Sequence, residues 1–576
     1  MKFLMIYPNK VMVTRAPLGI GYVASFLKKN GHEFKLFDTT FIRCGVCPGD
    51  DALREKNLQV TNPDFEKLGL VERDVDVFEE LDKEIQSFKP GIIGMSTVDP
   101  NHNFGLELLK YCKEKYPEIP IIVGGPLATL VPEEIICEDC IDMIGVGECE
   151  ETVVEICNNL DAGNWEGLYE LSNLWVKDKN FKENGKIYKN DPKLPDISKG
   201  LAPDLEIYDK RHFLRPLGGR IYNMATVIWT RGCVFRCSYC ANETFYKAAN
   251  ATAREYYRKK DVKELVEELA YFKKKLNLNF LMFVDDIFPL HEPEMMDEFC
   301  TLYKKHVDLP FSVNLQCKLV KEDCFAKAVD AGMRNVCIGV ESGSPRVRKD
   351  ILKRNYKDED VLRVFGFAKK YKIRHSSFNI IGLPYEARED IFQTIELNRK
   401  INPSSATVTF FHPYRGAPLR ELCVKLGYID KDAAKHEDVY RSDSQINLPQ
   451  ITKSELKGIM QNFQLYMKLP EEYKEIIEKQ ESPDRDEEEQ KLREEVLLPK
   501  FREVQAKEPQ WDFRKKQKWW TTDIDEESTL PQELYPGFTT PRSESRVTLP
   551  NTKPGDAGFY PLLNKKENVE TRKEET

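Results

Sequence analysis

The stretch WTRGCVFRCSYCAN, Trp229 to Asn242, holds three cysteines within eight residues in the spacing C-x3-C-x2-C. It follows the apolar run MATVIWT, which predicts a buried strand. Cys233, Cys237 and Cys240 can converge on one metal cluster because the turn between them lets three thiolates point inward. A structural zinc site would need a fourth ligand in a nearby pair, which this loop lacks. A 4Fe-4S cluster held by three thiolates keeps one iron open, and we predict such a cluster.

The strand before the cysteines opens a series of apolar runs separated by helical patterns. The runs are MATVIWT, NFLMFVDD, PFSVNLQ, NVCIGVES, SSFNIIGLP and SATVTFFHP. Six β/α units over about 200 residues predict a partial (β/α)6 barrel across residues 223–425. In such a barrel the chemistry lies on the loops at the carboxyl ends of the strands, which is where the cysteines fall.

The rest of the α/β chain divides by composition. Residues 1–160 contain five short apolar strands with helices between them, which predict a doubly wound, flavodoxin-like parallel sheet with ligands at the strand carboxyl ends. The polar segment 161–222 is expected to be a connector, and 426–480 to be a helical region that covers the barrel. Residues 481–576 form a charged, then proline-rich tail, expected to be helical at first and extended or disordered later.

Charge and hydropathy limit the possible partners and compartments. The formal net charge of the 576-residue chain is −9, so we expect no nucleic-acid partner. No apolar run approaches the roughly 20 residues that cross a bilayer, and the N-terminus lacks the pattern of a secretion signal. We therefore predict a cytoplasmic protein without a membrane span. The fifteen cysteines are expected to be reduced thiols, some of them metal ligands.

The cysteine triplet, with Tyr239 just before its last cysteine, resembles the radical S-adenosylmethionine (SAM) superfamily. The resemblance implies that the three cysteines hold a 4Fe-4S cluster, that the open iron chelates SAM, and that Tyr239 backs the adenine. It also implies that an aspartate of FVDDIF receives the SAM ammonium group, without deciding which of the two acts. The resemblance further implies that Glu341 and Ser342, in GVESGS, contact the ribose and methionine ends of SAM. The implied SAM residues are Tyr239, Asp285, Asp286, Glu341 and Ser342.

The N-terminal strands carry a second resemblance. PLGIGYVASFLKKNGHEFKLFD, IIGMST, IIVGGP and GVGECEET together resemble the cobalamin-binding domain that precedes the radical SAM domain in one large class of these enzymes. The glycines let backbone approach a bulky ligand. The cobalamin residues expected are Ser96, Gly124, Gly125, Gly147 and Glu148. The Asp-x-His-x-x-Gly signature is absent, so the resemblance implies cobalamin without a lower histidine ligand. His102 is the nearest candidate for such a ligand, but we expect this loop histidine to be solvated.

These resemblances imply a cobalamin-dependent radical SAM enzyme similar to the class B methyltransferases. The expected reaction is methyl transfer to an unactivated carbon or phosphorus centre through a 5′-deoxyadenosyl radical and methylcobalamin. One alternative is a cobalamin-assisted cyclase or rearrangement enzyme, and another is an iron-sulfur sensor or assembly protein with a vestigial SAM site. The expected partners are a small-molecule or peptide substrate and an electron donor such as flavodoxin or ferredoxin.

Two further Cys-x-x-Cys pairs, Cys44/Cys47 and Cys137/Cys140, could in principle form a second metal site. In the expected order of strands the first pair follows a strand and the second precedes one, which places them at opposite edges of the sheet. We therefore expect incidental thiols there. The same argument weighs against a methylthiotransferase, which would need a second N-terminal cluster.

Overall fold

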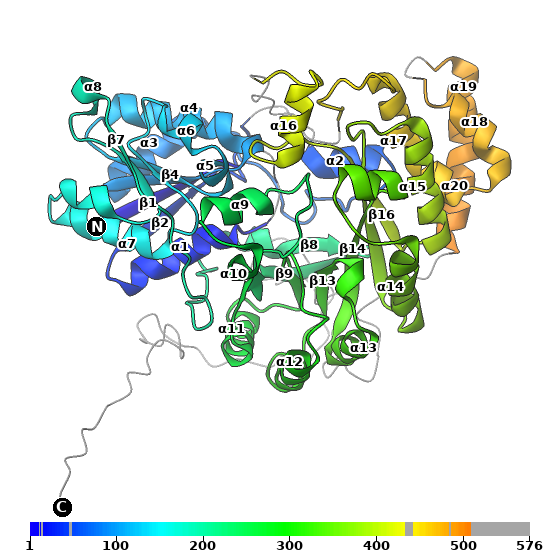
Figure 1. The fold of residues 1–576 in the computed structure, drawn as a ribbon, viewed down its shortest axis with the longest axis horizontal. Helices are drawn as coiled ribbons and strands as arrows, with labels where there is room; N and C mark the ends of the chain where they lie inside the picture. Colours follow the sequence, from blue (N-terminus) through cyan, green and yellow to red (C-terminus); the bar gives the residue numbers. More distant parts are fainter. Residues whose placement is uncertain (11, 13–14, 45–48, 432–441, 483–484, 508–576) are drawn as a thin grey trace, which may run out of the picture.

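The structure is a computed structural model that describes all residues except 11, 13–14, 45–48, 432–441, 483–484 and 508–576. An N-terminal sheet domain lies beside a second domain built on its own sheet, and the C-terminal helices lie on the far side of that second domain (Figure 1). Among the described residues, no helix combines the length and apolar character needed to cross a membrane.

The first sheet has the strand order β2-β1-β3-β4-β5-β6-β7. Strands β1 to β5 are parallel, whereas β6 and β7 join in antiparallel fashion. The order 2-1-3-4-5 is the flavodoxin-like one, so the predicted doubly wound sheet is confirmed. The strands are β1 Lys2–Tyr7, β2 Glu33–Asp38, β3 Ile92–Ser96, β4 Ile121–Gly124, β5 Met143–Gly145, β6 Leu174–Lys177 and β7 Ile187–Lys189.

Amphipathic helices cover both faces of this sheet. Helix α3 shows why they form: Asp76 caps it by accepting hydrogen bonds from the Phe78 and Glu79 backbone N–H groups, and Leu81 and Ile85 are buried one turn apart. The helices of this domain are α1 Leu18–Lys29, α2 Gly49–Lys56, α3 Val77–Phe88, α4 His102–Lys115, α5 Pro126–Leu130, α6 Pro132–Ile136, α7 Glu150–Asp161 and α8 Phe181–Asn184.

The segment 161–222, expected to be a connector, contributes strands to both sheets. It supplies β6 and β7 to the first sheet and β8 to the second. Between them, the chain lies along α1: Ser25 Oγ donates to the Ala202 carbonyl at 2.6 Å, and Tyr208 OH donates to the Pro17 carbonyl at 2.6 Å. One hydrophobic core includes Phe3, Tyr208 and Ala225, so the two domains are packed through a shared interior.

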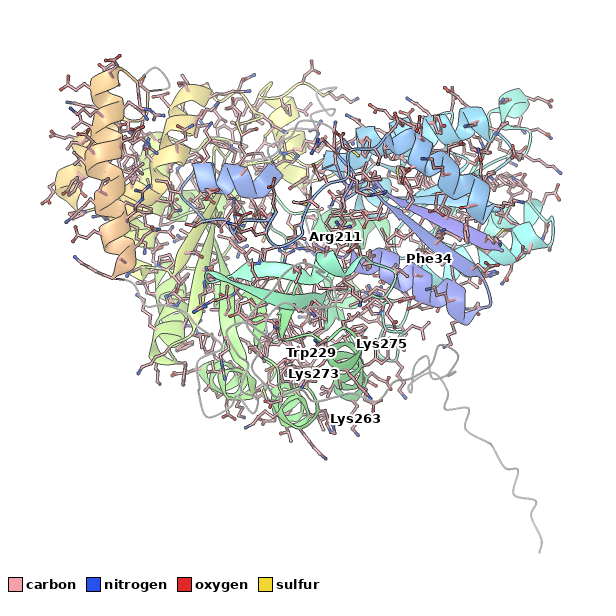
Figure 2. The ribbon with its side chains drawn as sticks, turned by 180° about the vertical axis from the view of Figure 1, so that it is seen from behind. Phe34, Arg211, Trp229, Lys263, Lys273 and Lys275 are labelled. Atoms are coloured by element: carbon pink, nitrogen blue, oxygen red, sulfur yellow. The ribbon has the colours of Figure 1, made fainter. Side chains whose placement is uncertain are left out.

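The second sheet is the predicted partial barrel. Its order is β16-β15-β14-β13-β12-β9-β8, with six consecutive parallel strands and β8 antiparallel at one edge. Trp229 is fully buried where β9 ends and packs against Phe299, with ring centroids 4.6 Å apart (Figure 2). The strands are β8 Leu214–Leu217, β9 Arg220–Val227, β12 Phe280–Phe283, β13 Phe311–Leu315, β14 Met333–Glu341, β15 Arg374–Ile381 and β16 Ser405–Phe410.

Helices alternate with these strands along the chain. They are α9 Asn242–Ala248, α10 Ala253–Tyr256, α11 Val262–Lys275, α12 Pro293–His306, α13 Glu322–Ala331, α14 Asp358–Lys370, α15 Arg388–Ile401 and α16 Pro418–Lys425. Because each strand is followed by a helix that returns the chain to the start of the next strand, the carboxyl ends of all six parallel strands lie at one edge.

The C-terminal region covers the barrel beside α15. Its first helix begins at a capping box in which the Thr452 side chain and Glu455 exchange hydrogen bonds with the backbone. Arg388 of α15 makes a two-bond ion pair with Glu481 at 2.7 and 2.9 Å. The helices are α17 Lys453–Lys468, α18 Lys474–Lys479, α19 Glu487–Leu492 and α20 Leu498–Ala506. The proline-rich part of the expected tail lies outside the described residues.

Candidate active site at the domain junction

The cysteine loop leaves β9 through a short ribbon formed by β10 (Thr230–Arg231) and β11 (Arg258–Lys259). Gly232 follows with φ of 88°, and a Cβ there would lie 2.6 Å from the Tyr256 carbonyl oxygen. Only glycine fits this turn into the first cysteine. The loop is held further on by Ser238, whose backbone N–H donates to the Leu352 carbonyl at 3.1 Å and whose hydroxyl donates to that of Ile351 at 2.5 Å.

The three loop cysteines are partly buried and influence one another electrostatically. Burial is the main cause that raises the pKa of Cys233 to about 12 and that of Cys240 to about 11, and the charges of Asp286 and the neighbouring thiols contribute to both increases. Two donors face the sulfurs: Asn242 Nδ2 lies 3.5 Å from Cys240 Sγ, and Arg354 Nη1 lies 4.0 Å from Cys237 Sγ. Hydrogen-bond donors beside sulfur suit thiolates that ligate iron.

Within the described residues, no three His, Cys, Asp or Glu side chains gather closely enough to hold a single metal ion. A 4Fe-4S cluster does not require this, since each cysteine binds a different iron. The three thiols with donors beside them therefore fit a cluster. Of the other pairs, Cys137 is exposed and Cys140 is buried, while Cys47 lies outside the described residues.

The two aspartates after β12 have different surroundings. Asp285 is 1% exposed, and its Oδ1 accepts hydrogen bonds from the backbone N–H groups of Trp229 at 2.9 Å and Thr230 at 2.5 Å. Burial raises the pKa of Asp285 to about 7. Asp286 is exposed and lies near enough to the cysteines to add to the pKa increase of Cys240 that burial causes. Of the two, Asp286 is thus the one whose carboxylate is accessible to a ligand, whereas Asp285 fixes the end of β9.

Glu341 ends β14 in the left-handed region, with φ of 60°, which is rare for a residue other than glycine and concentrates at functional sites. Its Oε1 accepts a hydrogen bond from Arg354 Nη1 at 3.3 Å. The same nitrogen lies 2.6 Å from Tyr239 OH, and Nη2 donates to the Gly339 carbonyl at 3.2 Å. Arg354 therefore joins Tyr239, Glu341 and a cluster cysteine.

Sequence reasoning missed Arg354, because nothing in ILKRNY separates it from the neighbouring lysine. Only the fold shows that Arg354 is 8% exposed while Lys353 points to solvent. Ser342, by contrast, is fully buried, with its hydroxyl 3.4 Å from that of Thr394 in α15. The structure thus places Ser342 against a barrel helix.

The expected cobalamin residues lie at the ends of β3, β4 and β5, which are neighbours in the sheet. A Cβ on Gly124 would meet nothing within 4 Å, so the strand end is open there. Gly125 differs: its φ is 93°, and a Cβ would lie 2.9 Å from Ser96 Oγ and from the Thr97 carbonyl oxygen. Gly124 faces free space while Gly125 makes the turn, and this open strand end fits a large cofactor held by shape.

The structure changes one expectation for this edge and adds a contact to another. His102 was expected to be solvated, but it begins α4 and is 5% exposed. Burial, with a contribution from Arg415, lowers the pKa of His102 to about 4. Glu148, which was expected to contact cobalamin, has one arginine hydrogen-bonded to each carboxylate oxygen: Arg231 to Oε2 and Arg258 to Oε1.

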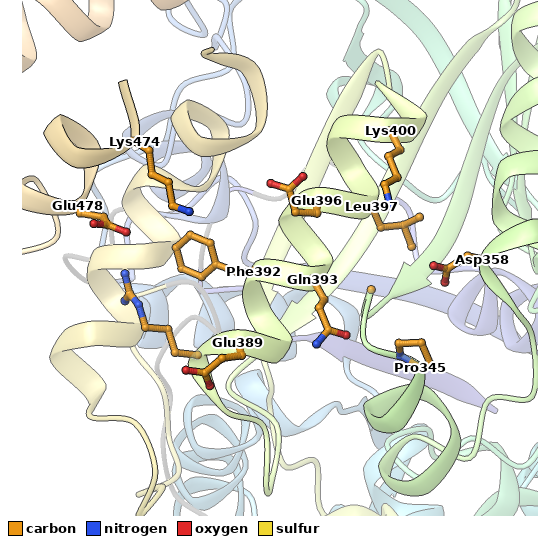
Figure 3. A pocket seen from close by; sticks show the side chains of 12 residues that line it. Pro345, Asp358, Glu389, Phe392, Gln393, Glu396, Leu397, Lys400, Lys474 and Glu478 are labelled. Carbon is orange, nitrogen blue, oxygen red and sulfur yellow. The ribbon is translucent and has the colours of Figure 1, made fainter. Parts of the chain in front are cut away.

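A groove runs along α15 and is lined mainly by side chains of that helix (Figure 3). Its lining mixes both charges, with Glu389, Glu396 and Lys400 on α15 and Lys474 on α18. Its lining includes Gly343 and Pro345, which follow the end of β14, but none of the loop cysteines and neither Gly124 nor Gly125.

Comparison with known proteins agrees with this geometry. Residues 9–157 match the B12 binding domain family, and residues 227–397 match the Radical SAM superfamily. The chain is 26% identical over 436 residues to "Uncharacterized methyltransferase PH0819" of Pyrococcus horikoshii, covering 74% of this chain and 83% of the relative. It is 23% identical to the "Anaerobic magnesium-protoporphyrin IX monomethyl ester cyclase" of Rubrivivax gelatinosus, covering 74% and 70%.

Among solved structures, the cobalamin-dependent SAM radical enzyme OxsB with aqua-cobalamin bound superposes with a TM-score of 0.58 at 15% identity. The match covers 89% of this chain and 77% of OxsB, which shows a shared fold. The chain is a radical SAM enzyme of the cobalamin-dependent, methyltransferase-like class. Its cofactors are a 4Fe-4S cluster, SAM and cobalamin.

Proposed function

We propose that this enzyme transfers a methyl group from SAM to an unactivated carbon or phosphorus centre of a small-molecule substrate. When bound, the reduced cluster supplies the electron that cleaves SAM into methionine and a 5′-deoxyadenosyl radical, and cobalamin supplies a methyl carrier. One observation carries the proposal: Glu148, next to the open glycine edge, is bonded to Arg231, two residues before Cys233. This contact supports the proposal because it would bring the two expected cofactor edges together at the domain junction.

The residues at the barrel edge would position SAM. Asp286 offers an accessible carboxylate for the SAM ammonium group, and Arg354 offers a buried cation close to Glu341 and Cys237 for the SAM carboxylate. Opposite charges in a partly buried site attract more strongly than in water. Tyr239, held by its hydrogen bond to Arg354, would bound the adenine side. The cluster would receive its electron from a donor such as flavodoxin or ferredoxin.

Anaerobic reconstitution with iron, sulfide and cobalamin, followed by incubation with SAM and a chemical reductant, tests this proposal. We expect both 5′-deoxyadenosine and S-adenosylhomocysteine, because SAM serves as radical source and as methyl donor. Replacement of the three cluster cysteines by alanine should abolish the deoxyadenosine. A sensor with a vestigial SAM site would yield neither product, and a cyclase without methyl transfer would yield deoxyadenosine alone.

A further inference from the structure

The cysteine loop and the cobalamin edge are joined by a cluster of buried ion pairs. Arg231 and Arg258 are direct partners across the β10–β11 ribbon, so their side chains emerge together. Arg231 Nη1 and Arg258 Nη2 each donate to a different carboxylate oxygen of Glu148. Arg231 Nη1 also donates to Glu150 Oε1 at 2.8 Å, and Arg258 Nη1 to the Pro195 carbonyl at 2.9 Å. We call Arg231, Arg258, Glu148 and Glu150 the junction lock.

The junction lock is shielded from solvent and balanced in charge. The exposed fractions of its side chains are between 11% and 16%, and two arginines face two glutamates. Arg231 also lies over the ring of Tyr22 in α1, 4.5 Å from its centroid. Because a buried charge left without its partner is costly, the two sides of the junction are held in one arrangement.

On one side, the lock is fixed to the cobalamin edge. Glu148 follows Gly147, whose backbone N–H donates to Thr129 Oγ1 at 2.9 Å. Thr129 belongs to α5, which starts directly after Gly125, and its hydroxyl donates to the Gly125 carbonyl at 3.3 Å. The loops after β4 and β5 are therefore hydrogen-bonded to each other directly beside Glu148.

On the other side, the lock is fixed to the first cluster cysteine. Only Gly232 separates Arg231 from Cys233, and the close approach of that glycine to Tyr256 leaves the turn no freedom. Tyr256 in turn lies two residues before Arg258. The position of Cys233 is thus set by the same ribbon that binds Glu148.

We propose that the junction lock sets the position of the iron-sulfur cluster relative to cobalamin, and that Glu148 is a positioning residue rather than a cobalamin contact. The proposal rests on the assignment of both cofactors to these edges. It explains why the charges of the lock are turned toward one another instead of toward a ligand. It does not depend on whether the enzyme transfers methyl.

The test is the magnetic interaction between the reduced cluster and cobalt(II) cobalamin, measured by pulsed EPR on the full-length holoprotein. Wild type should give one narrow distance distribution. In Glu148→Gln the distribution should become at least twice as broad, with iron and cobalamin contents unchanged, because both arginines lose their shared anion. Glu148→Asp keeps the charge and should restore a narrow distribution. Glu481→Gln is the matched control, since it breaks the two-bond pair with Arg388 away from the junction and should change nothing.

Two results would overturn the proposal. One is a distribution in Glu148→Gln as narrow as that of wild type. The other is loss of cobalamin from Glu148→Gln with iron retained, which would make Glu148 a cobalamin contact. If Glu148→Gln does not fold, Arg258→Lys serves instead: it keeps the charge but loses the second guanidinium bond, and it must broaden the distribution. Wild type that binds no cobalamin would contradict the cofactor assignment itself, which separates that failure from failure of the lock.

Discussion

The two parallel sheets present different kinds of surface at the carboxyl ends of their strands. In the first sheet, β3 and β4 end in the small, uncharged residues Ser96 and Gly124, and Gly124 faces open space. The edge of the barrel ends in thiols and charges, with Asp286, Glu341 and Arg354 around the cysteines. Cobalamin is large and can be held by shape, whereas a cluster and a charged nucleoside require ligands and counter-charges. Volume changes should therefore damage the first edge, and changes of ligand or charge the second.

The largest effect is expected from removing the cluster ligands. Replacing Cys233, Cys237 and Cys240 together by alanine should abolish the absorbance near ~400 nm and the roughly four irons per chain after reconstitution. Cobalamin should still bind, because its edge belongs to the other sheet. Cys137→Ala removes an exposed thiol elsewhere and should keep all the iron. A triple variant with a full iron load would show that the ligands lie elsewhere.

Arg354 tests the role of charge at the barrel edge. In Arg354→Leu, Glu341 and Tyr239 lose the donor that they share, and SAM loses a positively charged partner. We expect the affinity for SAM to fall about 100-fold, because a hydrogen bond to a charged group contributes ~2–3 kcal/mol. Equilibrium binding of SAM to the reconstituted protein measures this. Lys353→Leu is the matched control, since that neighbour is exposed. Equal SAM affinities of the two variants would contradict a role for Arg354.

Gly124 tests the role of shape at the first edge. Gly124→Leu should lower cobalamin retention at least about tenfold while the fold survives, because the new side chain enters the open space of the site. Gly366→Leu, on α14, is a matched control with nothing within 4 Å of a Cβ. Gly125→Leu should instead impair folding, since its Cβ would meet the protein itself. Full cobalamin occupancy in Gly124→Leu would place the cofactor elsewhere.

A smaller effect concerns a buried acid in the loop between β15 and α15. Glu386 accepts hydrogen bonds from the Gly382 and Leu383 backbone N–H groups, and burial raises its pKa from 4.5 to about 8, with Asp390 raising and Arg346 lowering it. The folded protein thus binds this proton more tightly than the unfolded chain. The free energy of unfolding should therefore fall as pH rises between about 4.5 and 8, by at most about 1.4 kcal/mol per pH unit from this group.

Urea unfolding of the apoprotein from pH 5 to 8 measures that slope. Glu386→Gln should flatten it, whereas Glu389→Gln, at an exposed neighbour, should leave it unchanged. A slope that is identical in wild type and Glu386→Gln would show that Glu386 does not titrate in this range.

The fold was more predictable from sequence than the site. Strand and helix periodicity predicted both parallel sheets, because buried strands such as KFLMIY read as continuous apolar runs. The segment 161–222 was predicted to be a polar connector because its strands, β6, β7 and β8, are short and lie near the edges of the sheets. The cysteine spacing predicted the cluster loop since its three ligands lie in one local turn.

Contacts between segments far apart in sequence could not be predicted. The choice between Asp285 and Asp286 depends on which of them faces the Trp229 backbone. The ion pair between Glu148 and Arg258 joins residues 110 positions apart in the sequence. The hydrogen bond between Arg354 and Tyr239 joins residues 115 positions apart. No local pattern encodes such pairs, and only the packed fold brings them together.

The central claim is that the two edges act in one reaction that uses SAM twice. The most direct measurement is the ratio of 5′-deoxyadenosine to S-adenosylhomocysteine produced by the wild-type enzyme during turnover of its substrate. Methyl transfer predicts a ratio close to one, because each turnover consumes one SAM as radical source and one as methyl donor. Deoxyadenosine without S-adenosylhomocysteine would contradict methyl transfer and leave a radical SAM enzyme of another reaction type.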